Sequence, residues 1–473
     1  MAVGSSNSFD LVVLGAGTGG YAAAFRASQL GLRVALVDED KIGGTCLHRG
    51  CIPTKALLET AAVVQRVAHA GEFGVRVPGE ASIDYAKVAE RRDMVVNRMW
   101  KGLGSLVKKY KVTWVQGRGR LDGPHKVRVR GADGAEVVLE ATDVILATGS
   151  RVKSLPGITP DGVRIVTSDD VLRMGTLPAS AIVIGAGAVG VEFASFYHDM
   201  GSTVTLLEYL PGIVPLEDRD VSRELERTFT RRGIRVMTNA RIDTASVAAD
   251  ADGVQLSVAP EGGRSESFRA EVLLVAAGRS ANVEDIGLET TAAVVDRGMV
   301  KVDGHMRTRE PHLYAIGDIV GGLQLAHTAA HEGIIAAHVI AGEPDVHPMD
   351  YVRQPRATYC RPEIASVGLT EQQCEAQGLP VKVGKMPFQA VGKAIIGGEH
   401  EGFAKVIGHA DTDETLGIHV IGPHATDLIA EASLALWLEA TPWEIGAATH
   451  AHPTLSEVLG EAAMAVDGRS INF

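Results

Sequence analysis

The stretch FDLVVLGAGTGG, residues 9–20, decides the first unit of the fold. It is a short run of apolar, strand-forming residues that ends in glycines at 15, 17 and 20, the pattern G-x-G-x-x-G on a strand-to-helix turn. Gly15 permits the tight turn, Gly17 lets the backbone approach a pyrophosphate, and Gly20 lets the helix pack on the strand. The stretch therefore predicts a dinucleotide-binding turn.

The residues that follow complete this unit. An alanine-rich segment at residues 21–30 predicts a helix, and a second strand, RVALVD, ends in Asp38. An acid at this distance from the glycines is placed to accept a hydrogen bond from a ribose hydroxyl. Strand, helix, strand and acid together make a much more specific signal than the glycines alone.

The same unit returns 170 residues later. AIVIGAGAVGVE carries Gly185, Gly187 and Gly190, and the strand TVTLLE ends in Glu208. Each copy closes with an apolar strand that runs into a glycine turn, DVILATGS at 143–150 and EVLLVAAGRS at 271–280. The sequence thus predicts two dinucleotide sites on duplicated α/β domains.

Glu208 also predicts which nicotinamide nucleotide is preferred. A 2′-phosphate held about 4 Å from its carboxylate would cost roughly 1 to 4 kcal/mol. We therefore expect NAD to be preferred over NADP.

A cysteine pair follows the first unit, in GGTCLHRGCIPTK at residues 43–55. Zinc would need a second pair of ligands near Cys46 and Cys51, and the sequence offers only His48 between them. A second alternative is that both cysteines are unreactive and only structural. We favour a redox-active dithiol over both alternatives. The spacing predicts both sulfurs on one side of the first turns of a helix, with Lys55 on the same face as Cys51.

Composition limits the function classes. A chain of 473 residues should form about three or four domains. A net charge of −12 disfavours nucleic acid as a partner. No apolar run reaches the roughly 20 residues of a membrane span, and the start MAVGSSNSFD lacks the pattern of a signal peptide, so we expect a cytoplasmic protein.

With these motifs, the chain resembles the flavoprotein pyridine nucleotide-disulfide oxidoreductases over nearly its whole length. Within that family it resembles the members that oxidise dihydrolipoamide. The family pattern is also present as YAIGD at 314–318, LAHTAAHEG at 325–333 and HAHPTLSE at 450–457. GRSAN at 278–282 and His331 depart from the usual residues in loops.

The resemblance implies FAD and NAD as cofactors, no metal, and a residue set for each site. The FAD set is Gly15, Gly17, Gly20, Asp38, Gly44, Thr45, Lys55, Thr148, Gly149, Asp318 and Ala326. The NAD set is Gly185, Gly187, Gly190, Glu192, Glu208 and Gly278. The catalytic set is Cys46, Cys51, His452 as base and Glu457 as the carboxylate that orients it.

The predicted architecture is α/β, with an FAD domain at 1–149, an NAD domain at 150–277, a central segment at 278–348 and an α+β dimerisation domain at 349–473. The resemblance implies a homodimer in which His452 serves the disulfide of the other subunit, and a lipoyl domain of a 2-oxoacid dehydrogenase or glycine-cleavage complex as substrate. The alternatives are a disulfide reductase with another substrate and a flavin-bearing scaffold protein; a scaffold would need none of the four catalytic residues.

Overall fold

The computed structural model describes residues 7–79, 82–260 and 263–472. The chain divides into two compact units, each built from segments that are distant in the sequence. Unit 1 comprises residues up to 56 together with 87–153 and 279–351, and unit 2 comprises 57–86, 154–278 and the residues from 352 onward. The limits of the four domains stay a prediction, and residues 1–6 and 473, at the outer ends of the first and last, lie outside the described residues.

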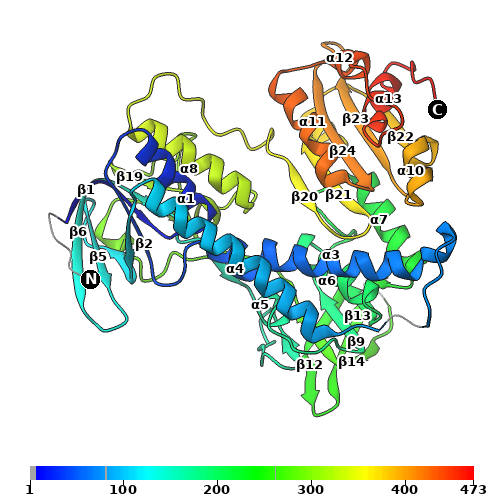
Figure 1. Ribbon diagram of the computed structural model, residues 1–473, viewed down its shortest axis with the longest axis horizontal. Coiled ribbons are helices and arrows are strands. Elements are labelled where there is room, and N and C mark those ends of the chain that lie inside the picture. Colours follow the sequence, from blue (N-terminus) through cyan, green and yellow to red (C-terminus); the bar gives the residue numbers. More distant parts are fainter. Residues whose placement is uncertain (1–6, 80–81, 261–262, 473) are drawn as a thin grey trace. The chain divides into compact units, whose positions relative to one another are not determined.

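Unit 1 contains a seven-stranded sheet of order β3-β2-β1-β6-β5-β4, with β19 also paired to β6. Strands β3, β2, β1, β6 and β19 run parallel, while β5 pairs antiparallel with β6 and β4 (Figure 1). The seven strands are β1 Ser8–Leu14, β2 Val34–Asp38, β3 Thr113–Gln116, β4 Arg118–Leu121, β5 Lys126–Arg130, β6 Glu136–Leu146 and β19 Leu313–Ala315. Two separate two-stranded sheets pair β7 Ser150–Val152 with β16 Arg279–Ala281, and β17 Val295–Asp296 with β18 Met299–Val300.

Helices α1 and α8 cover one face of this sheet and pack tightly on each other. A Cβ on Gly333 would lie 2.6 Å from the Gly19 carbonyl oxygen, so only glycine allows the two backbones to approach this closely. The helices that begin in this unit or cross its limits are α1 Thr18–Gln29, α2 Gly44–Arg49, α3 Cys51–Ala68, α4 Tyr85–Lys109, η2 Leu288–Thr290, η3 Gly317–Val320 and α8 Ala326–Ile340.

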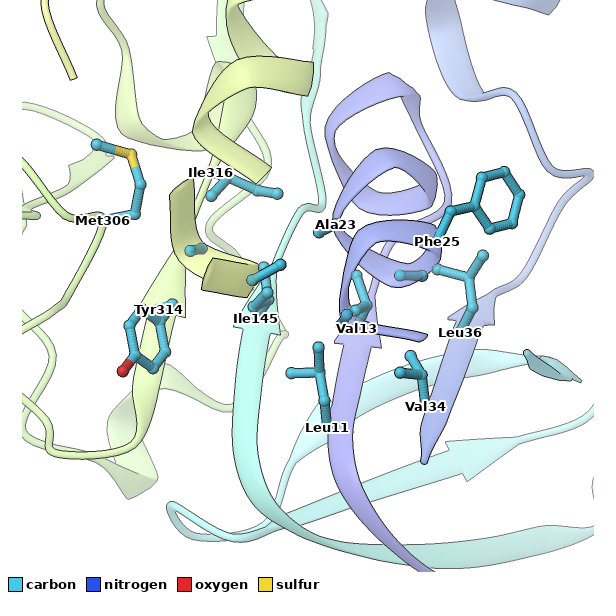
Figure 2. Close-up of a cluster of buried hydrophobic side chains, with 14 of the residues drawn as sticks. Leu11, Val13, Ala23, Phe25, Val34, Leu36, Ile145, Met306, Tyr314 and Ile316 are labelled. Atoms are coloured by element: carbon cyan, nitrogen blue, oxygen red, sulfur yellow. The ribbon is translucent and has the colours of Figure 1, made fainter. Parts of the chain in front are cut away.

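The core of unit 1 lies between the sheet and these helices. Figure 2 shows Leu11 and Val13 of β1 and Ile145 of β6 beneath α1, whose Ala23 faces them. Residues 11–13 are fully buried, as expected for a strand inside a parallel sheet that is covered on both faces. Burial of this strand fixes the position of the glycine turn that follows it.

Unit 2 repeats this plan in a five-stranded parallel sheet of order β11-β10-β9-β15-β8. An antiparallel sheet of β12, β13 and β14 extends it. The elements are β8 Ile165–Val166, α5 Ser168–Val171, β9 Ser180–Ile184, α6 Ala188–Asp199, β10 Thr203–Leu207, α7 Arg219–Arg232, β11 Arg235–Met237, β12 Ala240–Asp250, β13 Gly253–Pro260, β14 Glu266–Ala270 and β15 Val272–Val275.

The C-terminal part of unit 2 is an antiparallel sheet of order β20-β21-β24-β23-β22. Helix α11 packs on β21 and β24, and α13 packs on β22 and β23. The elements are β20 Arg356–Thr358, β21 Glu363–Gly368, α9 Glu371–Gln377, β22 Val381–Pro387, α10 Gly392–Gly397, β23 Phe403–His409, β24 Thr415–Gly422, α11 Ala425–Trp437, α12 Pro442–Ala447 and α13 Glu457–Ala465. The α/β class predicted from the sequence is confirmed.

Candidate functional site

The first glycine turn joins β1 to α1 and requires glycine at two positions for steric reasons. Gly15 has φ +107°, and a Cβ there would lie 2.2 Å from the Ala147 carbonyl oxygen. A Cβ on Gly20 would lie 1.9 Å from the Gly15 oxygen. At Gly17, by contrast, a Cβ would meet nothing within 4 Å, so the space beside this turn is open. Such a cradle fits a dinucleotide pyrophosphate.

Asp38, at the end of β2, is fixed beside this turn. Its Oδ2 accepts the Ala16 N–H at 2.7 Å, and its Oδ1 accepts the Asp40 N–H at 2.9 Å. Each carboxylate oxygen retains a further lone pair with which it can accept a ribose hydroxyl.

The second turn, between β9 and α6, repeats this geometry. Gly185 has φ +94°, a Cβ on Gly190 would lie 1.8 Å from the Gly185 oxygen, and Gly187 again faces open space. Glu208 accepts the Ala186 N–H at 2.6 Å and the Leu210 N–H at 2.8 Å. The two sites thus have the same hydrogen bonds in the same places, although one uses Asp and the other Glu.

Both helices begin without a side-chain cap, because their N-cap residues are Gly17 and Gly187. The backbone N–H groups of their first turns are therefore available to a phosphate, as is the positive end of each helix dipole. The residues present fit a dinucleotide at each turn.

Further predicted FAD residues follow β6, at the same edge of the sheet as the first turn. Thr148 donates its hydroxyl to the Asn282 carbonyl at 2.8 Å, and the Asn282 side chain donates to the Thr148 carbonyl at 2.9 Å. The Asn282 N–H also donates to Gly149 at 2.9 Å. The loop at 278–282, which departs from the family pattern, thus fixes the Thr148–Gly149 turn.

Asp318 lies in the turn after β19, whose partner strand is β6. Its Oδ2 accepts the Ser150 hydroxyl and lies 3.6 Å from Arg279 Nε, which also donates to the Ser150 hydroxyl at 2.6 Å. Ala326 is the first residue of α8. In unit 1 the carboxyl ends of β2, β1, β6 and β19 therefore bring Asp38, the glycine turn, Thr148 and Asp318 to one edge, where parallel sheets bind ligands.

The cysteine pair lies on two helices rather than on one. Cys46 belongs to α2, whereas Cys51 is the first residue of α3, and Gly50 interrupts the helix between them with φ −146° and ψ −117°. The prediction that one helix carries both cysteines was wrong, because the chain turns at Gly50, where a Cβ would lie 3.0 Å from the Thr45 oxygen, closer than most Cβ contacts. Cys51 still lies at a helix N-terminus, which favours a thiolate.

The two sulfurs of the pair are in contact. A hydrogen bond with Cys51, followed by burial, raises the pKa of the Cys46 thiol, while the Thr18 hydroxyl and Lys55 act in the opposite direction. The Cys46 thiol is therefore the member of this coupled pair that stays protonated. Gly44, with φ +58°, brings the start of α2 against the glycine turn, since a Cβ there would lie 2.5 Å from Gly17 Cα.

His452 and Glu457 form a hydrogen-bonded pair in unit 2. His452 Nδ1 lies 2.8 Å from Glu457 Oε1, while Glu457 Oε2 accepts the Thr454 N–H at 2.9 Å. The His452 side chain is 78% exposed, so its Nε2 edge is accessible. Burial opposes the charged form of Glu457, but the bonds from His452 and Thr454 outweigh it and lower the pKa of this carboxyl.

Helix α13 begins at Glu457, so His452 lies before the helix. The Thr454 hydroxyl donates to the Ala451 carbonyl at 2.7 Å and closes a separate turn before the helix. His450 lies in a different environment from His452, since its Nε2 is 2.7 Å from Glu431 Oε1 and its side chain is largely buried.

Glu192 and Gly278 are the remaining predicted NAD residues. Glu192 is buried in α6 and accepts the Tyr359 N–H at 2.9 Å. Gly278 has φ +98° in the turn after β15 and faces open space. The roles of the individual site residues stay predictions.

Sequence reasoning missed Asn282, Ser150, Arg279 and Thr18. All four lie within motifs quoted from the sequence, but each acts through a contact with a residue distant in the sequence, which the motif alone does not reveal. Among the described residues, no group of three or more His, Cys, Asp or Glu side chains could hold a metal ion. No helix in the described ranges is long and apolar enough to cross a membrane.

Comparison with protein families gives two matches along the chain. Residues 9–333 match the model described as pyridine nucleotide-disulphide oxidoreductase, and residues 354–463 match the dimerisation domain of the same group.

Two curated relatives carry the name dihydrolipoyl dehydrogenase. The protein from Bacillus subtilis is 47% identical and covers 98% of this chain and 99% of its own, and that from Zymomonas mobilis is 43% identical with the same coverage. Among solved structures, LpdA from Mycobacterium tuberculosis superposes with a TM-score of 0.88 at 29% identity, covering 96% of this chain and 98% of its own.

Proposed function

Because this chain belongs to the pyridine nucleotide-disulphide oxidoreductases, we propose that it oxidises protein-bound dihydrolipoamide to lipoamide through Cys46 and Cys51, with NAD as the final acceptor. FAD and NAD are the cofactors of this family, which confirms the cofactors predicted from the sequence. The dimerisation domain makes the protein a homodimer.

The observation that carries the proposal is the dithiol formed by Cys46 on α2 and Cys51 at the start of α3, with the start of α2 packed against the first glycine turn at Gly17. When bound, FAD accepts an electron pair from the dithiol and passes it to NAD as hydride. The protein's own residues convert the two substrate thiols into a disulfide, and the electron pair passes to Cys51.

The reaction starts from the Cys46–Cys51 disulfide. His452 Nε2 takes the proton of one dihydrolipoyl thiol, whose sulfur attacks Cys46, and the bond between the two cysteines breaks with Cys51 leaving as a thiolate. Glu457 holds Nδ1 and so leaves Nε2 free to accept that proton.

The second substrate thiol then displaces Cys46. Cys46 takes the proton held on His452 and leaves as a thiol, while the proton of the second substrate thiol passes to His452. The product is lipoamide, with a Cys46 thiol that donates a hydrogen bond to the Cys51 thiolate. This product state agrees with the raised pKa of Cys46.

In the homodimer we assign His452 to the dithiol of the other subunit, and we assign the substrate to a lipoyl domain of a 2-oxoacid dehydrogenase or glycine-cleavage complex. Lys55, four residues after Cys51 on α3, is assigned to favour negative charge on the reduced flavin. Lys55 and Glu192 together are assigned to tune the flavin between its two half-reactions. The protein is expected to act in the cytoplasm.

A substrate comparison tests the proposal against other disulfide reductases. The purified yellow protein is assayed with NADH and lipoamide, glutathione disulfide or oxidised thioredoxin, and in reverse with a dihydrolipoyl domain and NAD. We expect kcat/KM for the lipoyl substrates to exceed the others by at least about 10²-fold, since positioned acid–base catalysis contributes on that order. Equal values for glutathione disulfide would refute the assignment of lipoamide.

A further inference from the structure

Glu332 is a buried carboxylate that none of the steps above uses. It lies on α8 with 1% of its surface exposed. Its Oε2 accepts the Gly317 N–H at 2.5 Å, and its Oε1 accepts the Tyr351 hydroxyl at 2.8 Å. A carboxylate is costly to bury, and these two donors are what compensate it.

The Gly317 N–H matters because Gly317 directly precedes Asp318. Gly317 has φ +74°, and it leads from β19 into η3 at the carboxyl end of the sheet. The side chain of Asp318 is held by Ser150 and Arg279, whereas the backbone of its turn is held by Glu332. The turn is therefore fixed from two sides by residues distant in the sequence.

Tyr351 packs against the chain just after η3, at Gly322. A Cβ on Gly322 would lie 3.1 Å from Tyr351 Cε1, so the ring packs against the backbone of Gly322. Its hydroxyl donates to Glu332, which also binds Gly317. Glu332 and Tyr351 together thus hold both ends of η3.

The charge of Glu332 changes close to neutral pH. Burial raises the pKa of this carboxyl to about 7, against the opposing effects of the Gly317 and Tyr351 hydrogen bonds, and the charge of Asp318 raises it further. Of the described residues, Asp318 on η3 and Tyr351 are the ionisable groups that act on it, with Arg279 of β16 beside Asp318. Helix α1 contributes the backbones of Gly19 and Ala23 to the contact with α8 at Gly333.

We propose that Glu332 is a positioning residue of the FAD site, whose carboxylate holds the turn of Gly317 and Asp318 in the geometry that binds the cofactor. This proposal rests on the role of Asp318 in binding FAD, but it does not depend on which disulfide is the substrate. A neutral acid accepts a hydrogen bond more weakly than a carboxylate does, so the turn is held less firmly once Glu332 is protonated.

The first test measures FAD binding to the full-length apoprotein by quenching of flavin fluorescence. Glu332→Ala removes the acceptor and leaves a buried N–H unpaired, so we expect the Kd for FAD to rise about tenfold or more. Glu332→Gln keeps an acceptor oxygen and should restore the Kd to within about threefold of wild type. Equal losses in both variants, or none in Glu332→Ala, overturn the proposal.

The second test is the pH dependence of the same Kd, a readout that loss of packing alone would not change. Wild-type affinity should fall as the pH is lowered through about 7, whereas Glu332→Gln should lack this component. Tyr351→Phe removes a bond that lowers the pKa of Glu332, so the midpoint should move to higher pH. The proposal is contradicted if the midpoint of this pH dependence does not move in Tyr351→Phe. It is also contradicted if the Kd of Glu332→Gln depends on pH as that of the wild type does.

A third measurement needs no cofactor. Amide hydrogen exchange at Gly317 in the apoprotein should be protected in wild type and in Glu332→Gln, and about tenfold less protected in Glu332→Ala. Unprotected Gly317 in the wild type overturns the role of Glu332. If the wild-type apoprotein binds no FAD, our assignment of the FAD site is wrong. If it binds FAD but does not turn over lipoamide, only the assignment of lipoamide as substrate is wrong.

Discussion

Glu457 Oε1 lies 2.8 Å from His452 Nδ1, and the same carboxylate caps the turn before α13 through the Thr454 N–H. One side chain therefore fixes both the position of the imidazole ring and the nitrogen left free for the substrate. The neighbouring His450 has its own carboxylate partner, Glu431. This pairing makes His450 a matched control for His452.

Replacement of His452 by Gln should lower kcat for dihydrolipoamide oxidation by roughly 10² to 10⁴-fold, because the base is lost. Glu457→Gln should lower it by a smaller factor, and His450→Gln should leave it within about threefold of wild type. Steady-state assays of the three variants decide this. If kcat fell more in His450→Gln than in His452→Gln, His452 would not be the catalytic base.

The pH dependence of the same reaction follows from Glu457. Its pKa is lowered below the ordinary value of 4.5, so its ionised form supports the folded site above that value. This support is lost only as the pH falls through the lowered pKa. Wild type and Glu457→Gln should therefore differ at neutral pH and converge in acid, as kcat/KM measured from neutral to acid pH would show.

We expect the preference for NAD over NADP to depend on Glu208. Glu208→Gln removes the negative charge, and the ratio of kcat/KM for NAD over NADP should fall by about one to three decades. Glu208→Asp keeps the charge and should keep most of the preference. An unchanged ratio in Glu208→Gln would place this carboxylate away from the ribose.

The glycines of the second turn should separate nucleotide binding from stability. At Gly187 a Cβ meets nothing within 4 Å, so Gly187→Ala should change the free energy of unfolding by less than about 0.5 kcal/mol while it weakens NAD binding. Gly190→Ala would place a Cβ 1.8 Å from the Gly185 oxygen and should destabilise the domain. Gly175→Ala, also in open space, is the control; equal NAD affinity in Gly187→Ala and Gly175→Ala would contradict the account.

The sequence predicted the features that depend on local order. The glycine turns and the acids that follow β2 and β10 are predicted by short patterns, and they lie where expected. The break at Gly50 was missed because it results from a close backbone contact rather than from helical propensity. The contacts of Asn282 with Thr148 and of Glu332 with Gly317 were beyond reach, since each joins segments whose proximity only the folded sheet creates.

The sharing of sites between subunits is tested with heterodimers. Cys46→Ser and His452→Gln subunits should each be inactive as homodimers. If His452 serves the dithiol of the partner, a heterodimer of the two has one intact site and should show about half the wild-type activity, because each wild-type dimer has two sites. Differently tagged chains allow this species to be isolated and assayed; activity no higher than that of either parent would show that each site lies within one subunit.

The passage of electrons through the cysteine pair is tested most directly by anaerobic titration of the yellow protein with dihydrolipoamide, followed by NAD. The wild-type protein should change its flavin absorbance as the dithiol forms, and should then produce NADH in proportion to the dihydrolipoamide consumed. Cys51→Ser should retain bound FAD, because we assign the hold on FAD to the glycine turn and Asp318 rather than to sulfur, yet it should produce no NADH. Formation of NADH by Cys51→Ser at the wild-type rate, or none by the wild type, would contradict the account.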